Sequence, residues 1–577
     1  MWIRAYPVAL ALLIIVAGCG APVQPTTSGV SSQSGAGSAP PSAPKRITAV
    51  IRGNPTSMAQ LWTDRSLGSP PGLDAVGDLV LAGLSYADQQ GTLHAGLADA
   101  VPSLENGQWQ LFPDGRMETT WKIKPNAQWH DGTLLTSADL VFSTVVEQDK
   151  ELPVAQNPAY ALIESVKAPD PSTVIVQWKQ PYIEADSMFS YELASPLPQH
   201  LLEGTYTADK ANLFNMPYWA EEFVGTGPFR IREWVPDSHL VLEAFDGYAG
   251  GRPKIDQIEV KFIVDGSAMG AALLAGAADL LLGRTLTPVD QAQQILDQRP
   301  DLRAERAFNS WYVVNIQFIG TDPPVIGDVR FRRAMLTAID RQQLVDSLAL
   351  GQSAIAHSML PPDSEAYKAV ESSLVRYDYD PRRAAQMVEE LGYSKGTDGF
   401  FYDAAGQKLS VQVYTTTRSE IQPRIVLAVA DFWKQLGVDV DPVMIPPQRI
   451  NDREYRAQFP AFEILSGANS IRSEDIRRMS SSSIPLPENH FTATGNNSRW
   501  SNPENDALVQ RYMTTIPYAE RMQVLADLLH LRTDQLPVMG LFFEAEFTIH
   551  NAKLERVTSR GPRSSQAWNA QLWDLQS

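Results

Sequence analysis

The chain has 577 residues but only one cysteine, Cys19. No disulfide can form within one molecule, so stability must come from buried apolar surface, which a chain of this length supplies. A catalytic thiol would need a histidine partner from elsewhere in the fold. Because Cys19 directly follows an apolar run, in the segment LLIIVAGCG of residues 12–20, its position favours a role in targeting.

Basic runs are also absent. The net charge is −18 and the isoelectric point is near 5.0. A surface that binds nucleic acid needs a basic face, which this balance does not provide. We therefore expect no nucleic-acid partner.

The sequence lacks the spacing of a metal site. Its eight histidines are scattered and form no H-x-x-H pair or His/Asp cluster, whereas a zinc or nickel site needs several close ligands. No metal is expected. His130, in the turn WHDG of residues 129–132, is interpreted as a loop histidine that hydrogen-bonds to the backbone.

Catalytic and phosphate-binding motifs are missing as well. The chain has no G-x-S-x-G motif, which a serine hydrolase of the α/β type would carry. The segment GTGPF of residues 225–229 has neither the G-x-G-x-x-G pattern nor a lysine, so a tight strand entrance is a better interpretation than a phosphate cradle. We expect neither an enzyme nor a cofactor; a secreted hydrolase would rest only on the Ser, His and Asp content of any long chain.

The N-terminal segment has the layout of an export signal. Arg4 supplies a positive charge, residues 8–17 are apolar, and small residues precede Cys19. Residues 16–19, VAGC, resemble the lipobox of bacterial lipoproteins, which implies cleavage before Cys19 and a lipid on its sulfur. Residues 20–44 carry no charge and consist almost entirely of small and polar residues, a composition typical of a flexible tether.

No later stretch approaches eighteen uninterrupted apolar residues, so the remainder is expected to be soluble. Its length predicts two to four domains. Residues 47–51 read as a strand, and a helix is expected to begin at Thr136 or Ser137 with Asp139 in its first turn. After residue 318 strands and helices alternate, which predicts an α/β fold with a mostly parallel sheet covered by helices on both faces.

One predicted helix carries two adjacent arginines. Arg332 and Arg333 lie beside the apolar residues Met335, Leu336 and Ile339 in the segment FRRAMLTAIDR. A solvated helix face is expected for this pair rather than an anion site.

Six segments, in order along the chain, resemble the family 5 solute-binding proteins of ABC importers, the peptide and oligopeptide group. The resemblance covers about residues 50 to 550, which is nearly all of the chain after the tether. The segments are WKIKPNAQWHDGTLLTSADLVFS (121–143), GTGPFRIREW (225–234), GAALLAGAADL (270–280), DVRFRRAMLTAIDRQQLV (328–345), YDPRRAAQMVEELGY (379–393) and SRWSNPENDALV (498–509).

The resemblance implies a two-lobed periplasmic-binding-protein-like (type II) clamp with mixed, mostly parallel sheets and an inserted β-rich domain. The chain would cross between the lobes near residues 307–315 and 534–541. The expected parts are a signal peptide (1–18), a lipid anchor and disordered linker (19–44), a discontinuous lobe I (45–79, 191–308 and 538–577), the inserted domain (80–190) and lobe II (309–537).

Ligand-binding residues are expected where the two lobes would face each other. The carry-over from the family points to a tryptophan after the first strand, aromatics at the first crossing and two loops, one of which follows a strand whose carboxyl end would border an open crevice. The candidates are Trp62, Trp311, Tyr312, Tyr414, Thr415, Thr416, Thr417, Arg418, Gly467, Ala468, Asn469 and Ser470.

One departure from the family pattern concerns the ligand. Peptide-binding members typically carry an acidic residue at the place where this chain has Gly467-Ala468-Asn469-Ser470, and Glu474 and Asp475 come only later. A buried carboxylate would be the strongest partner of a ligand's ammonium group. The ligand is therefore left open among peptides, sugars, opines and metal chelates.

The resemblance implies a non-enzymatic, monomeric receptor held at the cell membrane through lipid on Cys19, outside the cytoplasm. It would capture a small solute or peptide and deliver it to an ABC permease complex. A sensory or regulatory lipoprotein that presents its ligand-bound form to a partner receptor, without transport, is the alternative.

The lone cysteine gives a direct test. We expect Cys19→Ser to release or misprocess the protein, because the sulfur that would carry the lipid is lost, while leaving ligand affinity unchanged. Membrane fractionation and the mass of the N-terminal peptide measure this. A variant that stays membrane-bound and correctly cleaved would contradict the lipobox assignment.

Overall fold

The structure is a computed structural model that describes residues 43–64, 69–154, 157–283, 288–417, 419–492, 495–561 and 565–576. The predicted signal peptide and Cys19 lie outside these ranges. Residues 44–577 belong to one compact unit. Within the described ranges, every helix is too short or too polar to cross a bilayer.

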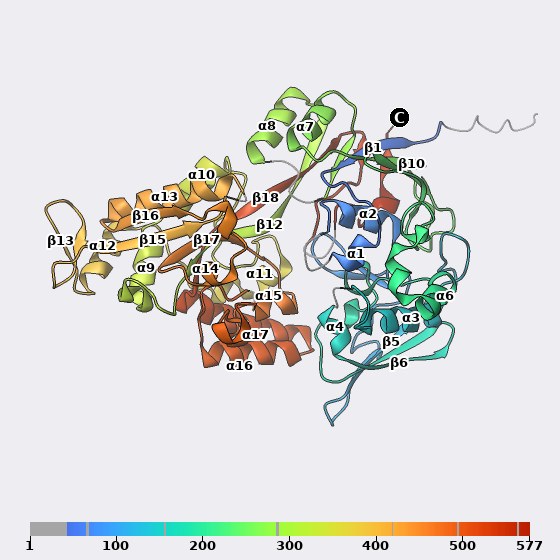
Figure 1. The fold of residues 1–577 in the computed structure, drawn as a ribbon, viewed down its shortest axis with the longest axis horizontal. Helices are drawn as coiled ribbons and strands as arrows, with labels where there is room; N and C mark the ends of the chain where they lie inside the picture. The colour runs from blue at the N-terminus through green and yellow to red at the C-terminus, as the bar shows by residue number, and fades with distance from the viewer. Residues whose placement is uncertain are drawn as a thin grey trace, which may run out of the picture. The chain divides into compact units, whose positions relative to one another are not determined.

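A ten-stranded mixed sheet runs through this unit (Figure 1). Its strands, in spatial order, are β16 (Asp439–Met444), β15 (Ser410–Thr415), β17 (Phe462–Gly467), β12 (Leu302–Ile316), β18 (Val538–Asn551), β11 (Leu280–Leu282), β1 (Arg46–Ile51), β10 (Gln257–Phe262), β9 (His239–Ala244) and β8 (Phe229–Val235). The strand expected at residues 47–51 is confirmed as part of β1.

The direction of the strands corrects one expectation. β1 pairs in parallel with β10 and β11, and β15 pairs in parallel with β16 and β17. The other neighbours are antiparallel, including the long pair β12 and β18 at the centre. The prediction of a mostly parallel sheet is wrong for the whole sheet and holds only within these two three-stranded groups, because hairpins and the central pair add antiparallel neighbours.

Of four hydrophobic cores among the described residues, two contain the strands on either side of the central pair. The first core contains β1, β8, β9 and β10 residues with the buried Trp62 and Trp219. The second core contains β15, β16 and β17 residues with the buried Trp433. Tyr312 of β12 and Met539 of β18 belong to the second core, whereas the other end of β18 reaches β11, next to β1.

Helices cover these strands. Helices associated with the first part of the chain are α1 (Gln60–Thr63), α2 (Leu73–Val80), α5 (Tyr191–Ala194), α6 (Gln199–Ala208), α7 (Gly266–Leu274) and α8 (Val289–Gln298). Those of the later part are α9 (Val329–Thr337), α10 (Arg341–Leu348), α11 (Glu365–Val370), α12 (Pro381–Glu389), α13 (Ile421–Leu436), α14 (Arg453–Ala457), α15 (Ser473–Arg477), α16 (Pro503–Thr514) and α17 (Tyr518–Gln535).

A separate antiparallel sheet lies within residues 109–178. Its spatial order is β4 (Trp109–Leu111), β5 (Met117–Lys122), β7 (Thr173–Trp178) and β6 (Ile163–Asp170). The helices α3 (Ser137–Gln148) and α4 (Pro158–Ala161) accompany it, and smaller two-stranded pairs are β2 (Ser85–Ala87) with β3 (Leu93–Ala95), β13 (Ser394–Lys395) with β14 (Phe401–Tyr402) and β19 (Leu554–Glu555) with β20 (Asp574–Leu575).

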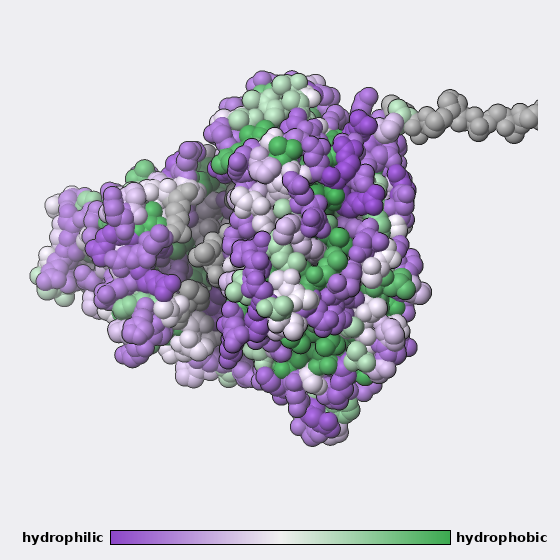
Figure 2. Space-filling view, turned by 45° about the vertical axis from the view of Figure 1, so that its right-hand side comes forward, coloured by the Kyte–Doolittle hydropathy of each residue, from purple (hydrophilic) through white to green (hydrophobic). Residues whose placement is uncertain are grey.

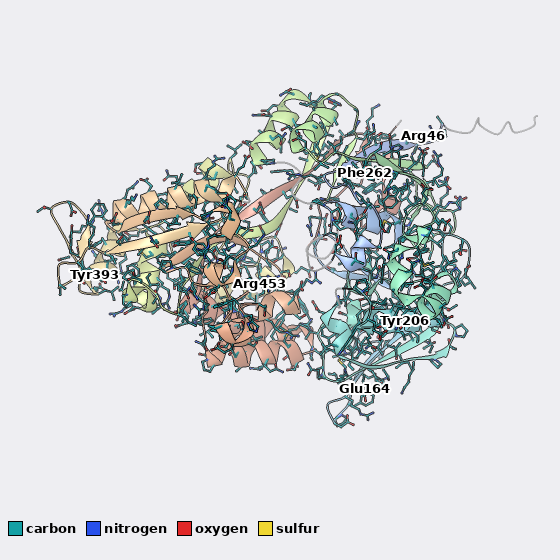
Figure 3. All side chains as sticks on the ribbon, in the orientation of Figure 1. Arg46, Glu164, Tyr206, Phe262, Tyr393 and Arg453 are labelled. Carbon is teal, nitrogen blue, oxygen red and sulfur yellow. The ribbon has the colours of Figure 1, made fainter. Side chains whose placement is uncertain are left out.

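The expected start of α3 is confirmed. Thr136 is the N-cap, and the carboxylate of Asp139 accepts from the backbone nitrogen of Thr136 at 2.8 Å, as in a capping box. The far end of α3 packs on α6. Tyr206, labelled in Figure 3, packs edge-on against Phe142 and donates its hydroxyl to Asp149 at 2.8 Å.

The expectation of a solvated face on α9 is wrong for Arg332. This side chain is only 3% exposed, and its guanidinium donates to the carbonyl oxygens of Ile326 and Gly327 and to that of Gln535 at the end of α17. Carbonyls at a helix C-terminus attract a cation because they lack intrahelical partners. Arg333 is half-buried and pairs with Asp534 at 2.5 Å.

Gly540 allows a close approach to the central pair. It lies opposite Val313 on β12, and a Cβ there would clash with the carbonyl oxygen of Ala356 and lie 2.8 Å from the ring of Trp311. The absence of a side chain at Gly540 therefore lets the segment at Ala356 and the Trp311 ring reach β18.

We expect Gly540→Ala to destabilise the protein by about 1–3 kcal/mol, the usual cost of overpacking. Gly204→Ala is the matched control, because Gly204 is an exposed residue of α6 whose added Cβ meets nothing within 4 Å. That change should stabilise by about 0.5–1 kcal/mol. Thermal melting of both variants tests this, and an unchanged melting point for Gly540→Ala would contradict the packing described.

Candidate functional site

A pocket lies where four stretches far apart in the sequence meet. Its volume is about 30 Å³, enough for about two water molecules, so a larger solute enters only if the walls separate. Its lining residues are Asp78, Tyr86, Ala87, Leu93, Glu184, Ser187, Ser190, Tyr191, Leu193, Arg472 and Trp568.

Three aromatic side chains form part of its wall, and each is held in place. Tyr86 stacks on Trp568 with ring centroids 6.0 Å apart and planes at 24°. The indole nitrogen of Trp568 donates to the hydroxyl of Thr558 at 2.9 Å, and the hydroxyl of Tyr191 donates to the backbone oxygen of Asp74 at 3.0 Å. Burial raises the pKa of Tyr86, and the nearby Asp88 adds to this, so the ring stays a neutral phenol at pH 7.

Glu184 connects two distant segments at the pocket. Its side chain is 5% exposed and accepts hydrogen bonds from the hydroxyls of Tyr182 at 3.0 Å and Ser473 at 2.8 Å. The backbone nitrogen of Ser473 also donates to it at 3.4 Å. These bonds satisfy a buried carboxylate and join the loop after β7 to the start of α15.

The pocket carries charges of both signs. Arg472 supplies a guanidinium and pairs with Glu474 at 3.6 Å. Asp78 supplies a second carboxylate, which accepts from the backbone nitrogen and the hydroxyl of Ser565 at 3.1 and 2.6 Å. Two carboxylates, one guanidinium and aromatic faces suit a polar solute with both cationic and anionic groups.

The arrangement does not resemble a hydrolytic site. Ser187 and Ser190 line the pocket, but no histidine is among its described lining residues, and a serine nucleophile needs an adjacent base. The hydroxyl of Ser187 donates instead to the backbone oxygen of Glu184 at 2.9 Å.

The predicted segment of residues 467–470 leads directly to this pocket. Gly467 ends β17, Ala468 is half-buried, and the amide of Asn469 donates to the backbone oxygen of Phe308 at 2.7 Å. The hydroxyl of Ser470 donates to Asp475. These polar groups position the loop, and the residue that lines the pocket, Arg472, comes two positions later.

The predicted loop after β15 lies elsewhere. Tyr414 is half-buried and lies 6.2 Å from the ring of Tyr455. The hydroxyls of Thr415 and Thr416 are buried and donate to the backbone oxygen of Ile464 and the side chain of Gln422, each at 2.8 Å. Thr417 is exposed, and Arg418 lies outside the described residues.

The predicted aromatics are buried. Trp62 is 1% exposed and packs on Trp219 in the first core. Trp311 lines a second cavity. Tyr312 donates its hydroxyl to Glu544 at 2.7 Å, and burial, followed by the charge of Glu544, raises its pKa strongly. The structure thus places none of these three on the pocket around Arg472.

Sequence reasoning missed Glu184, Arg472, Tyr86 and Trp568. The sequence did contain one signal for Glu184, which interrupts the largely apolar and aromatic stretch PYIEADSMF. A charged residue in such a stretch is rarely buried unless it has hydrogen-bond or ion-pair partners. No comparable signal marks Trp568, whose partner Tyr86 is almost five hundred residues away in the chain.

The interpretation of His130 is confirmed. Its Nδ1 accepts from the backbone nitrogen of Gly225 at 3.1 Å, and its Nε2 contacts the carbonyl oxygen of Gly227 at 3.1 Å. Burial lowers the pKa of His130 to about 4, so the ring is neutral at pH 7. In the described ranges, no three histidine, cysteine or acidic side chains group as metal ligands.

Comparison with known families gives a match over most of the chain. The family model for bacterial extracellular solute-binding proteins, family 5 Middle, matches residues 99–483. The oligopeptide-binding protein AppA of Bacillus subtilis is 26% identical over 362 residues, which cover 62% of this chain. The matched region spans 62% of the length of that relative.

Solved structures share the fold. NikZ from Campylobacter jejuni in complex with Ni(L-His) superimposes with a TM-score of 0.69 and 20% identity, covering 92% of this chain and 100% of that one. NikA from Brucella suis in complex with Fe(III)-EDTA gives a TM-score of 0.73 with 17% identity and the same coverage. The two-lobed type II α/β architecture expected from the sequence is confirmed.

We expect His130 to make stability depend on pH. The unfolded chain takes up a proton on this residue near pH 6.5, while the folded chain does so only near pH 4. Unfolding is therefore favoured as the pH falls from 6.5, by about 2 kcal/mol at pH 5. Urea unfolding of His130→Gln should show a shallower loss between these pH values than the wild type.

His94→Gln is the control, since His94 is an exposed histidine that contacts Asp88. This variant should keep the wild-type loss of stability between pH 6.5 and 5. An equally steep loss in His130→Gln would show that His130 is not held neutral by its burial.

Proposed function

Because the chain belongs to the bacterial extracellular solute-binding proteins of family 5, we propose that it is a lipid-anchored extracytoplasmic receptor that delivers a small solute to an ABC permease. The proposed ligand is a peptide or a similar polar molecule that carries both cationic and anionic groups. The protein acts as a monomer, without catalysis, and lipid on Cys19 holds it at the membrane.

The observation that carries this proposal is the pocket around Arg472. Its walls come from residues 78–93, 184–193, 472 and 568, so separation of these segments opens it and their approach excludes water. Closure of that kind is how a two-lobed binding protein retains a solute. The hydrogen bonds between Glu184 and Ser473 would help to hold these segments together in the closed form.

The charges of the pocket support the ligand class. Glu184 or Asp78 would face an ammonium group, Arg472 would face a carboxylate, and the rings of Tyr86, Tyr191 and Trp568 would pack on apolar parts. The acidic residue that resemblance led us to expect near 467–470 would thus be replaced by a carboxylate from another segment. The names of similar proteins, which mention an oligopeptide, Ni(L-His) and Fe(III)-EDTA, are compatible with a polar, charged ligand.

A sensory role without transport is the second candidate, because the same closure would also expose a ligand-dependent surface to a partner receptor. Permease and ATPase genes beside the gene for this chain would favour transport. A lone gene beside a kinase gene would favour sensing.

Ligand capture predicts a thermal shift and compaction. In a screen of peptides, sugars and metal chelates, a true ligand should raise the melting temperature by linkage and reduce the radius of gyration in solution scattering. Native mass spectrometry of protein purified without denaturation identifies a co-purified solute. If no class of solute changed melting or scattering, and none co-purified, capture would be rejected.

Arg472→Gln should weaken binding of that ligand about 10- to 100-fold, because a charge-assisted hydrogen bond is lost. Arg477→Gln is the matched control: Arg477 is an exposed arginine at the end of α15 and does not line the pocket. Isothermal titration measures both. Equal affinities for the two variants would place the ligand elsewhere.

A further inference from the structure

A second cavity is lined only by residues within 311–540, none of which lines the pocket around Arg472. Its volume is about 40 Å³, which holds about three water molecules or one small ion. Its lining combines apolar side chains, among them Met359, Met479 and Leu529, with Arg341, Arg532 and His357.

Arg532 has a donor that the structure leaves unpaired. The side chain is 5% exposed, its Nε donates to Asn505 and its Nη2 donates to the backbone oxygen of Ile476, each at 2.9 Å. Its Nη1 is buried without a hydrogen-bond partner. A buried N–H group without a partner is costly and indicates a missing acceptor.

Two further groups of the same cavity lack an anionic partner. Arg341 is 5% exposed and donates only to backbone oxygens, those of Gly540 at 3.1 Å and Tyr377 at 2.6 Å and, more weakly, that of Ala356 at 3.4 Å. The Nδ1 of His357 is buried and has no partner.

The positive charge of the cavity is not neutralised by a direct ion pair. In the described part of the chain, no carboxylate lies within 4.0 Å of the guanidinium of Arg341 or Arg532. The acidic side chains that influence them from farther away are Asp378, which is exposed, and Asp506, which accepts from Ser481 and Asn505. Burial lowers the pKa of Arg341 to about 10 and that of Arg532 to about 9, so both remain cationic at pH 7.

We propose that this cavity binds a small monovalent anion of about the size of chloride or bromide, with Arg532 Nη1 and His357 Nδ1 as donors. The two guanidiniums supply the charge that compensates the anion. Because much of the wall is apolar, it cannot replace the hydration of fluoride or of a divalent oxyanion, so a weakly hydrated ion is preferred. The site would be a structural anion site between the second core and the cluster that contains Trp311, Met359 and Leu529, and it shares no lining residue with the proposed solute pocket.

Salt exchange tests the proposal on the full chain. At constant ionic strength and pH, replacing sodium fluoride or gluconate by chloride or bromide should raise the melting temperature by about 1–3 °C. A crystal grown in sodium bromide should show an anomalous peak in contact with Arg532 Nη1. Equal melting in all salts, with ordered water and no anomalous peak in the cavity, would overturn the proposal.

Variants separate the anion effect from general destabilisation. Arg532→Gln should lose the salt-specific shift in melting temperature. Arg332→Gln should lower the stability but keep this shift, because Arg332 is a buried arginine whose guanidinium donates to backbone carbonyl oxygens. If Arg532→Gln does not fold, His357→Phe should still weaken bromide binding about tenfold. Retention of full bromide affinity in both folded variants would refute the assigned donors.

Discussion

The hydrogen-bonded pair β12 and β18 is the constraint on which the rest of this structure depends. β12 has 15 residues and β18 has 14, and they pair from Leu302 with Asn551 to Asn315 with Val538. β12 also pairs with β17, and β18 also reaches β11 beside β1. The two cores therefore share one continuous sheet (Figure 1), and any movement between them has to be accommodated by this pair or by its two register shifts, at Phe308/Ser310 and Tyr312/Val313.

The pocket around Arg472 combines rigid and releasable parts. The rings of Tyr191 and Trp568 are fixed by hydrogen bonds to Asp74 and Thr558, whereas the hydrogen bond between Glu184 and Ser473 joins two distant segments beside the pocket. A hydrogen bond to a charged group is worth about 1.5–3 kcal/mol net, which is small beside the energy that holds each core. The face of the molecule seen in Figure 2 is mostly hydrophilic, with scattered hydrophobic patches.

The sequence was sufficient for features set by local chemistry or by family resemblance. The capped start of α3 at Thr136 follows from neighbouring residues, and the backbone-bonded His130 follows from the lack of nearby ligands. The type II architecture follows from six segments in fixed order. The hydroxyls of Thr415 and Thr416 illustrate the limit, because nothing in their own segment shows that Ile464 and Gln422 accept from them.

Other features depend on residues that are distant in the sequence and could not be predicted from it. Arg332 lies on the helix face that faces the end of α17, which is about two hundred residues later in the chain, so its burial has no local signature. Likewise, Tyr86 and Trp568 become neighbours only once both chain ends are folded. The parallel or antiparallel direction of β12 and β18 depends in the same way on which distant strand lies beside each, and this is why the expected sheet direction was only partly right.

The long separation of β12 and β18 along the chain has a consequence for folding. The strand β12 is complete more than two hundred residues before its partner β18, so the central ladder cannot close until residues 538–551 are also free to fold. Contacts of such long separation form late and slowly. A chain that is still growing, or one truncated before residue 538, would carry β12 with one edge uncovered, an exposed strand edge of the kind that pairs with other chains. The strand that joins the two cores is thus also the point at which an incomplete molecule is most prone to associate wrongly.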